Sequence, residues 1–378
     1  MRFLYRPLNR EPADILVMAL CPIGDTLFLT PALARLRERF RAARITVVLS
    51  PANEGILVDN PAVDARMYFR ERSAAPGLLR FAQGVRRISR LRPDLIVNFS
   101  AAGDWITLLA GLRAPRLSID MPFLWTVFGT RNRAFRRRHA IDHYLRVVEP
   151  VAGPCDDAEA RIPRYYLTDA ARREARALLV ADGVKPTDMI VTLHVGGDGF
   201  GGRKRWEPER FARVANALVE RYDARILIVG GKADLAATDA ALALIPRNAR
   251  SLVGKTSLGV TAALIEASAL FIGNDSSPLH LAAAVGAPAV GVYGPSDWGV
   301  FQPVGRPGYR IRALHSDLPC APCFRFIGNA PLWKPNPCYS YACLKAIDSR
   351  QVLAAAVELL GSGGRTSAHT PATLPESH

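Results

Sequence analysis

The chain has 378 residues, 49% of them hydrophobic, which is enough apolar material for about two globular domains. Its formal net charge of +15 indicates an anionic partner: a nucleotide, a membrane surface, a nucleic acid or a phosphorylated glycan. No apolar run approaches the ~20 residues that a membrane-spanning helix needs, and residues 1–12 lack the apolar region of a signal peptide. We therefore expect a cytoplasmic protein, with peripheral contact at the inner membrane as a further option.

The first half of the chain alternates strand and helix patterns, which is typical of α/β proteins. The first strand is expected at 14–20 and a helix at 27–40, so the loop 21–26 follows the carboxyl end of a parallel strand, where ligand crevices form. Gly24 lets the loop turn, and Asp25 is a candidate general base facing the crevice. The alternative is that Asp25 only caps the helix beginning at Leu27.

The second half begins near residue 185 and carries a glycine-rich basic loop, 196–205, directly after an expected strand. Arg203 and Lys204 in this loop can neutralise a departing diphosphate. The alternative is an ordinary solvated charged loop.

The stretch from Ala269 to Asp297 reads as strand, sharp turn, helix and strand. A helix that begins at the carboxyl end of a parallel strand offers unpaired N–H groups and a positive dipole end, which suit phosphate. Asp275, Ser276 and Ser277 add polar side chains to this turn, so we predict a pyrophosphate seat. The alternative is a capped turn without a ligand, in which His280 is a packing residue.

Two further clusters carry candidate functions. Five arginines are candidates for binding acceptor phosphates or anionic lipid. The alternative is a solvated loop. These residues are Arg131, Arg133, Arg136, Arg137 and Arg138.

Four of the six cysteines form a C-x2-C and C-x4-C pattern that suits a structural zinc or iron, with a disulfide or free thiols as alternatives. These residues are Cys320, Cys323, Cys338 and Cys343.

The fragments IGDTLFLTPALARLRERF, RKRWEPERF, GNDSSPLHLAAAVGAPAVGVYGPSD and CLKAID resemble glycosyltransferase family 9, the ADP-heptose lipopolysaccharide heptosyltransferases, over residues 14–360. The resemblance implies a GT-B fold, an α/β architecture in which two Rossmann-like domains face each other across a cleft. We expect an acceptor-binding domain at 1–165, a nucleotide-sugar-binding domain at 166–347 that includes the cysteine-rich segment 318–344, a terminal helix at 348–361 and a disordered tail at 362–378.

Carried over by motif, the resemblance makes Asp25 the catalytic base and Lys204 the lysine that contacts the donor phosphates. The Ser276–Ser277 pair departs from the Thr-Gly that is frequent in the family, and Asp234 stands where the family often has a glutamate for the ribose. The expected donor-binding residues are Gly24, Arg203, Asp234, Thr256, Asp275, Ser276, Ser277 and His280. Related autotransporter heptosyltransferases carry a similar four-cysteine iron site.

The sequence thus predicts an inverting glycosyltransferase that moves a heptose from ADP-heptose to a lipopolysaccharide core acceptor without a catalytic cofactor. The alternatives are another nucleotide sugar, a protein acceptor, or a sugar-nucleotide-binding protein without turnover. A nucleic-acid-binding function is disfavoured, because the basic residues are not joined by an aromatic platform. A dinucleotide oxidoreductase is disfavoured because the first loop lacks G-x-G-x-x-G.

Overall fold

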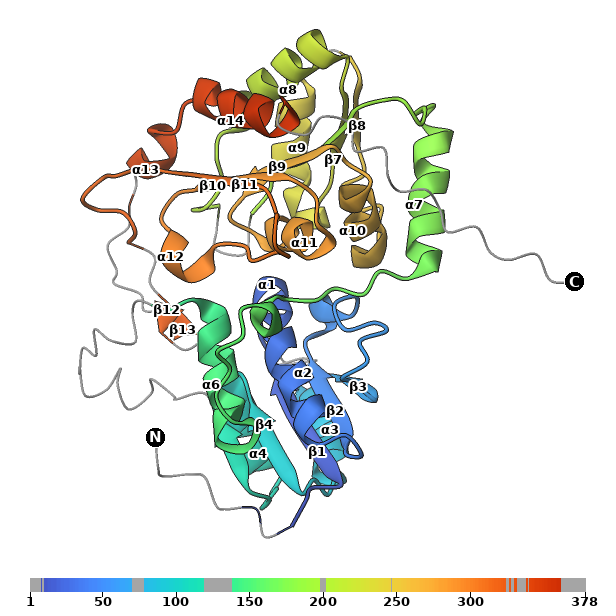
Figure 1. The fold of residues 1–378 in the computed structure, drawn as a ribbon, viewed down its shortest axis with the longest axis vertical. Helices are drawn as coiled ribbons and strands as arrows, with labels where there is room; N and C mark the ends of the chain where they lie inside the picture. The colour runs from blue at the N-terminus through green and yellow to red at the C-terminus, as the bar shows by residue number, and fades with distance from the viewer. Residues whose placement is uncertain are drawn as a thin grey trace, which may run out of the picture.

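The computed structural model describes residues 8, 10–69, 78–118, 138–197, 202–245, 247–323, 326–327, 330–331, 338 and 340–361. Arg131, Arg133, Arg136, Arg137 and the tail 362–378 lie outside the described residues. Two parallel sheets, each covered by helices, lie one above the other with their facing ends near the middle of the molecule (Figure 1). This is the two-unit α/β architecture that the sequence predicts.

The first sheet has the strand order β3-β2-β1-β4-β5, and all of its strands are parallel. In that order the strands are β3 (Ala65–Tyr68), β2 (Arg44–Leu49), β1 (Asp14–Ala19), β4 (Leu95–Asn98) and β5 (Arg116–Ser118). The chain order reverses between β1 and β4, so a crevice opens at the carboxyl ends of these two strands. The short turn after β1 leads into the helix that carries Asp25 and lies at this crevice.

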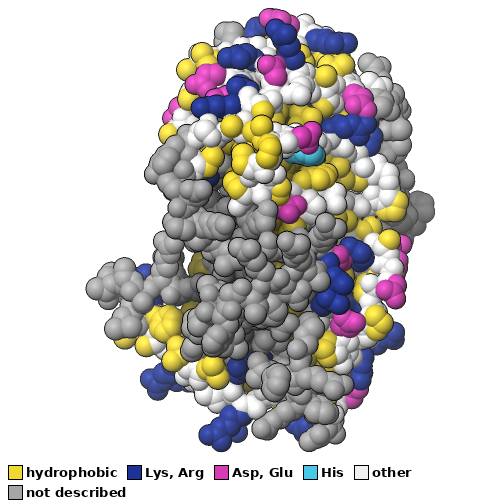
Figure 2. Space-filling view, turned by 90° about the vertical axis from the view of Figure 1, so that its left-hand side faces the viewer, with side chains coloured by type: hydrophobic (Ala, Val, Ile, Leu, Met, Phe, Trp, Pro, Cys, Tyr) yellow, Lys and Arg dark blue, Asp and Glu magenta, His cyan; other side chains and the backbone are white. Residues whose placement is uncertain are grey.

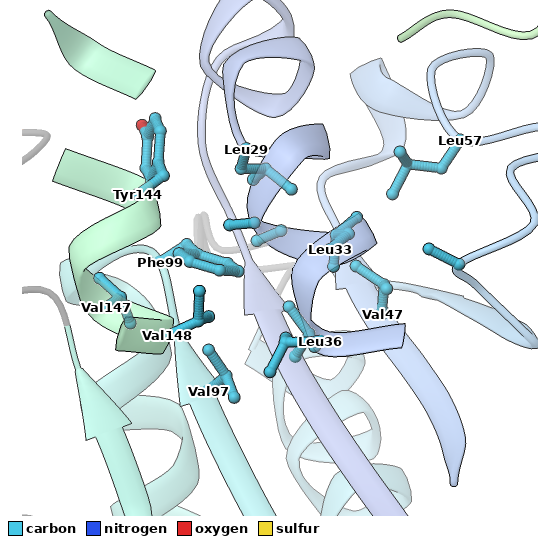
Figure 3. Close-up of a cluster of buried hydrophobic side chains, with 14 of the residues drawn as sticks. Leu29, Leu33, Leu36, Val47, Leu57, Val97, Phe99, Tyr144, Val147 and Val148 are labelled. Atoms are coloured by element: carbon cyan, nitrogen blue, oxygen red, sulfur yellow. The ribbon is translucent and has the colours of Figure 1, made fainter. Parts of the chain in front are cut away.

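Helices cover both faces of the first sheet. On one face lie α2 (Thr30–Arg39) and α6 (Ala140–Ala152), and on the other lie α3 (Leu78–Ser89) and α4 (Ala101–Leu109). Figure 3 shows the core beneath α2 and α6, where Leu36 lies towards Val97 of β4 and Leu33 lies beside Val47 of β2. Burial of such aliphatic side chains is the main force that fixes the helices on the sheet.

The second sheet repeats the same topology, with the order β8-β7-β6-β9-β10-β11. Its strands are β6 (Ile190–His194), β7 (Arg225–Ile228), β8 (Ala249–Ser251), β9 (Leu270–Asn274), β10 (Ala289–Tyr293) and β11 (Ile311–His315). One face packs against α8 (Pro208–Tyr222), α9 (Leu235–Leu242) and α14 (Ser349–Gly361). The other face packs against α7 (Asp169–Ala181), α10 (Leu258–Glu266) and α11 (Ser277–Val285). Here the order reverses between β6 and β9, so the second crevice opens beside His194 and Asn274.

Shorter elements connect these units. They are α1 (Ile23–Phe28), η1 (Pro51–Asn53), η4 (Glu159–Arg161), η6 (Lys232–Asp234), α12 (Trp298–Phe301), β12 (Phe326–Ile327), β13 (Ala330–Pro331) and α13 (Ala342–Lys345). No helix among the described residues has both the length and the apolar character to cross a membrane.

The helix expected from Leu27 to Phe40 is two helices, because α1 already begins at Ile23 and α2 begins at Thr30. Asp25 therefore lies in the first turn of α1 rather than before a helix. The N-cap of α2 is Leu29, which makes no side-chain capping bond, so the expectation that Asp25 caps this helix is wrong.

The two halves touch directly at the crevices. The ring of Phe28 on α1 meets His280 of α11 edge-on, with centroids 4.6 Å apart. A methyl group on Gly24 would lie 3.0 Å from Cδ2 of His280. His139, at the start of α6, donates from Nε2 to the carbonyl oxygen of Gln302 at 2.7 Å, while its Nδ1 accepts from the amide of Ile141. The described conformation is thus one in which the halves are closed on each other.

Candidate active site

Asp25 is a half-buried carboxyl group held by a tyrosine from a distant helix. Its Oδ1 accepts a hydrogen bond of 2.8 Å from the hydroxyl of Tyr144 on α6. The Tyr144 ring is itself buried and packs edge-on against Phe99 (Figure 3). Burial raises the pKa of Asp25 above its ordinary value, although the Tyr144 bond and the Lys204 charge act in the opposite direction.

The buried side chain of Asn53 supports the turn before Asp25. The Nδ2 group of Asn53, at the end of η1, donates to the carbonyl oxygen of Cys21 at 2.7 Å and to Oγ1 of Thr26 at 2.8 Å. Asn53 is fully buried. These bonds tie the turn between β1 and α1 to the neighbouring strand end, which fixes the backbone that carries Asp25.

The opposite wall is organised by Asn274, the last residue of β9. Its Nδ2 donates to the carbonyl oxygen of Gly196 at 2.7 Å, and its Oδ1 accepts from the amide of Trp206 at 3.0 Å. The Trp206 side chain is buried and donates from Nε1 to the carbonyl oxygen of Ile347 at 3.0 Å. These contacts anchor both ends of the basic loop, so Lys204 is placed beside the start of α11.

Lys204 and Asp275 form a buried ion pair on this wall. Nζ of Lys204 lies 2.8 Å from Oδ2 of Asp275, and the two side chains are 11% and 3% exposed. Burial alone would raise the pKa of Asp275, but the Lys204 ammonium, followed by His280 and the Ser296 hydroxyl, acts in the opposite direction, so the pKa lies below its ordinary value.

His280 follows one turn after the start of α11 and lies next to the same carboxylate, with Nε2 3.9 Å from Oδ1 of Asp275. That distance is too long for a hydrogen bond. Burial lowers the pKa of His280 to about 4, so the ring is neutral near pH 7 and its contact with Asp275 is not an ion pair. Ser276, at the start of α11, contacts Nδ1 of His194 through its hydroxyl at 2.9 Å.

The two walls share one cavity of about 160 Å³. It is lined by Pro22, Gly24, Asp25, Phe28, Gly197, Lys204, Asp275, Ser276, Ser277, His280 and Phe301. Small-molecule sites typically occupy about 300–1,000 Å³, so this cavity alone is smaller than such a site. The structure thus places Asp25 of the first half across the cavity from Lys204 and the N-terminus of α11 in the second half.

A larger cavity of about 500 Å³ lies near the connection between the halves, around Tyr165 and Leu258. The charged side chains in its lining are Glu54 and Glu174, both acidic. An acidic lining repels a diphosphate, so this cavity does not suit a nucleotide.

Three expected donor-binding residues lie outside the lining of the smaller cavity. Asp234 accepts hydrogen bonds from the amides of Gly197 at 3.1 Å and Gly231 at 2.9 Å. Thr256 bonds through its hydroxyl to Thr261 at 2.8 Å. Arg203 is half-buried on the same basic loop as Lys204. A donor role for these three residues therefore stays a prediction.

The structure describes all four clustered cysteines, and no disulfide joins them to one another. Cys343 is buried, whereas Cys320, Cys323 and Cys338 are exposed. Burial raises the pKa of the Cys343 thiol, and the other three thiols add to this rise. Within the described part of the chain, no group of three or more His, Cys, Asp or Glu side chains is arranged to hold a metal ion. The four thiols therefore do not form a metal site as they stand.

Two α/β units that face each other, with Asp25 on one wall of a shared cavity and the Lys204–Asp275 pair on the other, have the architecture of a GT-B glycosyltransferase. The sequence model described as glycosyltransferase family 9 (heptosyltransferase) matches residues 121–331, which is more than half of the 378 residues. The chain belongs to this family.

Similar proteins agree with this assignment. Lipopolysaccharide heptosyltransferase 3 of Escherichia coli K12 is 28% identical over 298 residues, which cover 74% of this chain and 82% of that protein. The solved family 9 glycosyltransferase from Veillonella parvula has a TM-score of 0.75 at 24% identity and covers 93% of this chain and 98% of its own. The ADP-heptose lipopolysaccharide heptosyltransferase II of E. coli has a TM-score of 0.71 at 19% identity and covers 93% of this chain and 100% of its own. The two solved structures share the fold described above.

Tyr144→Phe tests whether the Tyr144 hydrogen bond sets the pKa of Asp25. The substitution keeps the ring in the core but removes the hydrogen bond that lowers the pKa of Asp25, so this pKa should rise further. A general base must be ionised, so the acidic limb of the kcat profile should move to higher pH. We expect turnover on the acidic side to fall about tenfold or more, since bonds to charged groups contribute about 1.5–3 kcal/mol.

Tyr165→Phe is the matched control, because it removes a hydrogen bond of 2.9 Å to the Gly55 carbonyl that does not involve Asp25. It should leave the position of the acidic limb unchanged. An unshifted profile in Tyr144→Phe would show that Tyr144 does not set the ionisation of Asp25.

Proposed function

We propose that this chain is an inverting glycosyltransferase that transfers a heptose from ADP-heptose to a lipopolysaccharide core acceptor. One observation carries the proposal: Asp25 and the Lys204–Asp275 pair line opposite sides of one cavity. The substrates are supported by the printed names of the similar proteins, which are lipopolysaccharide and ADP-heptose heptosyltransferases. Asp25 lines the cavity rather than pointing away from it, which supports catalysis over binding without turnover.

In the reaction, the acceptor hydroxyl oxygen forms a bond to the anomeric carbon while the bond from that carbon to the donor phosphate breaks. Asp25 takes the proton of the acceptor hydroxyl as a general base. Lys204, held by Asp275, and the amide end of α11 stabilise the negative charge that develops on the departing ADP. Because base and leaving group lie on opposite walls, attack occurs opposite the departing phosphate and the anomeric configuration inverts.

The division of labour between the halves belongs to the same proposal. Residues 1–165 provide the base and receive the acceptor, and residues 166–347 bind the donor, with the terminal helix 348–361 packed on this second half. Closing the halves excludes water from the reacting carbon. We place the protein in the cytoplasm, in peripheral contact with the inner membrane that anchors its anionic glycolipid acceptor; the net charge of +15 supports this contact.

The donor assignment can be tested by calorimetry with ADP-, UDP- and GDP-sugars, followed by turnover on a truncated core oligosaccharide. We expect binding of ADP-heptose in preference to the other sugars and a product whose anomeric configuration is opposite to that of the donor. Tight binding of UDP- or GDP-sugars without a response to ADP-sugars would refute the heptose donor.

Lys204→Met should lower kcat about 10²–10³-fold, because it removes a charge preorganised for the leaving group.

Lys185→Met is the control for Lys204→Met, because Lys185 is exposed in the same half and does not line the cavity. Its turnover should match that of the unchanged protein. An equal loss in both variants would mean that bulk charge, rather than the Lys204–Asp275 pair, supports activity.

A structural zinc or iron at the four cysteines is the second part of the proposal, supported by their spacing in the sequence. Protein purified without chelator should contain about one metal ion per chain. Cys338→Ser should lose the metal and lower the thermal midpoint, whereas Cys155→Ser, at a thiol outside the cluster, should keep both. Metal-free unchanged protein would contradict the site.

A further inference from the structure

The outer surface of α3 and α4 combines exposed leucines with arginines. Leu79 is 68% exposed, Leu108 57% and Leu109 63%. The other large hydrophobic side chains that are exposed in the described residues, Val180, Leu235 and Leu244, are spread over the second half. The three leucines instead lie on two helices that pack against the same face of one sheet.

The apolar face of α3 packs into the core, and its basic face is exposed to solvent. Phe81, Val85 and Ile88, spaced four and three residues apart, pack into the cluster beneath α3 and α4. The segment from Leu78 to Arg92 contains five arginines and no acidic residue. With the arginine after α4, the exposed set is Arg80, Arg86, Arg87, Arg90, Arg92 and Arg113. Among the described residues, no ion pair to an acidic side chain is formed by these six arginines.

This surface, which we call the α3–α4 face, begins beside the cleft. Because α3 follows β3 and leads back to the start of β4, its first turn, with Leu79, lies at the carboxyl edge of the sheet that faces the second half. Its last turn, with Arg86 and Arg87, lies near the end of α4. Figure 2 shows hydrophobic and Lys/Arg side chains next to one another at the lower left, on the half that lies lower in the view.

We infer that the α3–α4 face rests on an anionic lipid bilayer. The arginines contact headgroup phosphates, and the leucines enter the boundary between headgroups and acyl chains. A surface for single-stranded nucleic acid would require exposed aromatic side chains for base stacking, and Phe81 on α3 is instead packed inward. The inference deepens the proposed function, on which it rests, because it states how a lipid-anchored acceptor reaches the cleft: the face lies along the membrane and the cleft opens beside it.

Sedimentation with vesicles tests this directly, using pure phosphatidylcholine vesicles and vesicles that also contain phosphatidylglycerol. The unchanged protein should bind the anionic vesicles and not the neutral ones. Arg87→Glu/Arg90→Glu should lower the partition constant about 30-fold or more, since each basic residue near such a surface contributes about a fivefold factor. Leu108→Gln/Leu109→Gln should also lower it, through loss of apolar insertion.

Arg173→Glu/Arg176→Glu is the matched control, because it makes the same charge change at exposed positions of α7 in the other half. It should keep most of the vesicle binding, and all variants should keep the thermal midpoint of the unchanged protein. Equal losses in the α3 and α7 variants, or unchanged binding in the α3 variant, would overturn the assignment. So would equal binding of the unchanged protein to neutral and anionic vesicles.

Turnover on two acceptors separates this inference from the proposed function. On a deacylated, water-soluble acceptor, Arg87→Glu/Arg90→Glu should match the unchanged protein, and on the same acceptor anchored in anionic vesicles it should fall. Equal turnover of both proteins on the anchored acceptor would count against the docking face. Absence of turnover by the unchanged protein on the soluble acceptor would count against the proposed function, while vesicle binding would still report on the face.

Discussion

The buried ion pair between Lys204 and Asp275 is the interaction on which the site depends. Each group is almost fully removed from water, and each is stable there only because the other is 2.8 Å away. Removing one member would leave an uncompensated buried charge, which typically costs about 3–5 kcal/mol. Asn274 and Trp206 anchor the basic loop through hydrogen bonds, and these bonds keep Lys204 next to the Asp275 carboxylate.

The same pair acts across the cleft on Asp25. The Lys204 charge favours ionisation of Asp25, the Asp275 charge opposes it, and burial opposes it most strongly. The net effect is that the pKa of Asp25 lies above its ordinary value, which favours a carboxyl group that accepts a proton during turnover. The contact between Phe28 and His280 joins the two halves beside the cavity of about 160 Å³ that Asp25 and Lys204 line.

Local patterns in the sequence were sufficient to predict the α/β architecture and the strand–helix junctions near which Asp25 and Asp275 lie, although Asp25 was expected in a loop and lies in α1. Each of these features is encoded within one strand–turn–helix segment, where apolar runs and turn residues determine the geometry. Tyr144 was missed because its partner is 119 residues away along the chain, and a tyrosine on an amphipathic helix gives no local signal of that contact. The break between α1 and α2 was also missed, since apolar periodicity continues through Leu29. The α3–α4 face became visible only when exposure was known, because Leu108 and Leu109 look like core residues in the sequence.

The central claim is that the two walls perform separate tasks, with proton transfer on one and binding of the nucleotide diphosphate on the other. Asp25→Asn tests it most directly, because asparagine has nearly the same shape and can still accept the Tyr144 bond, yet it cannot act as a base. Turnover and the dissociation constant for ADP should be measured on the same preparation. The account predicts that turnover falls about 10²–10⁴-fold while ADP affinity changes less than about threefold. Turnover close to that of the unchanged protein, or a parallel loss of ADP binding, would contradict it.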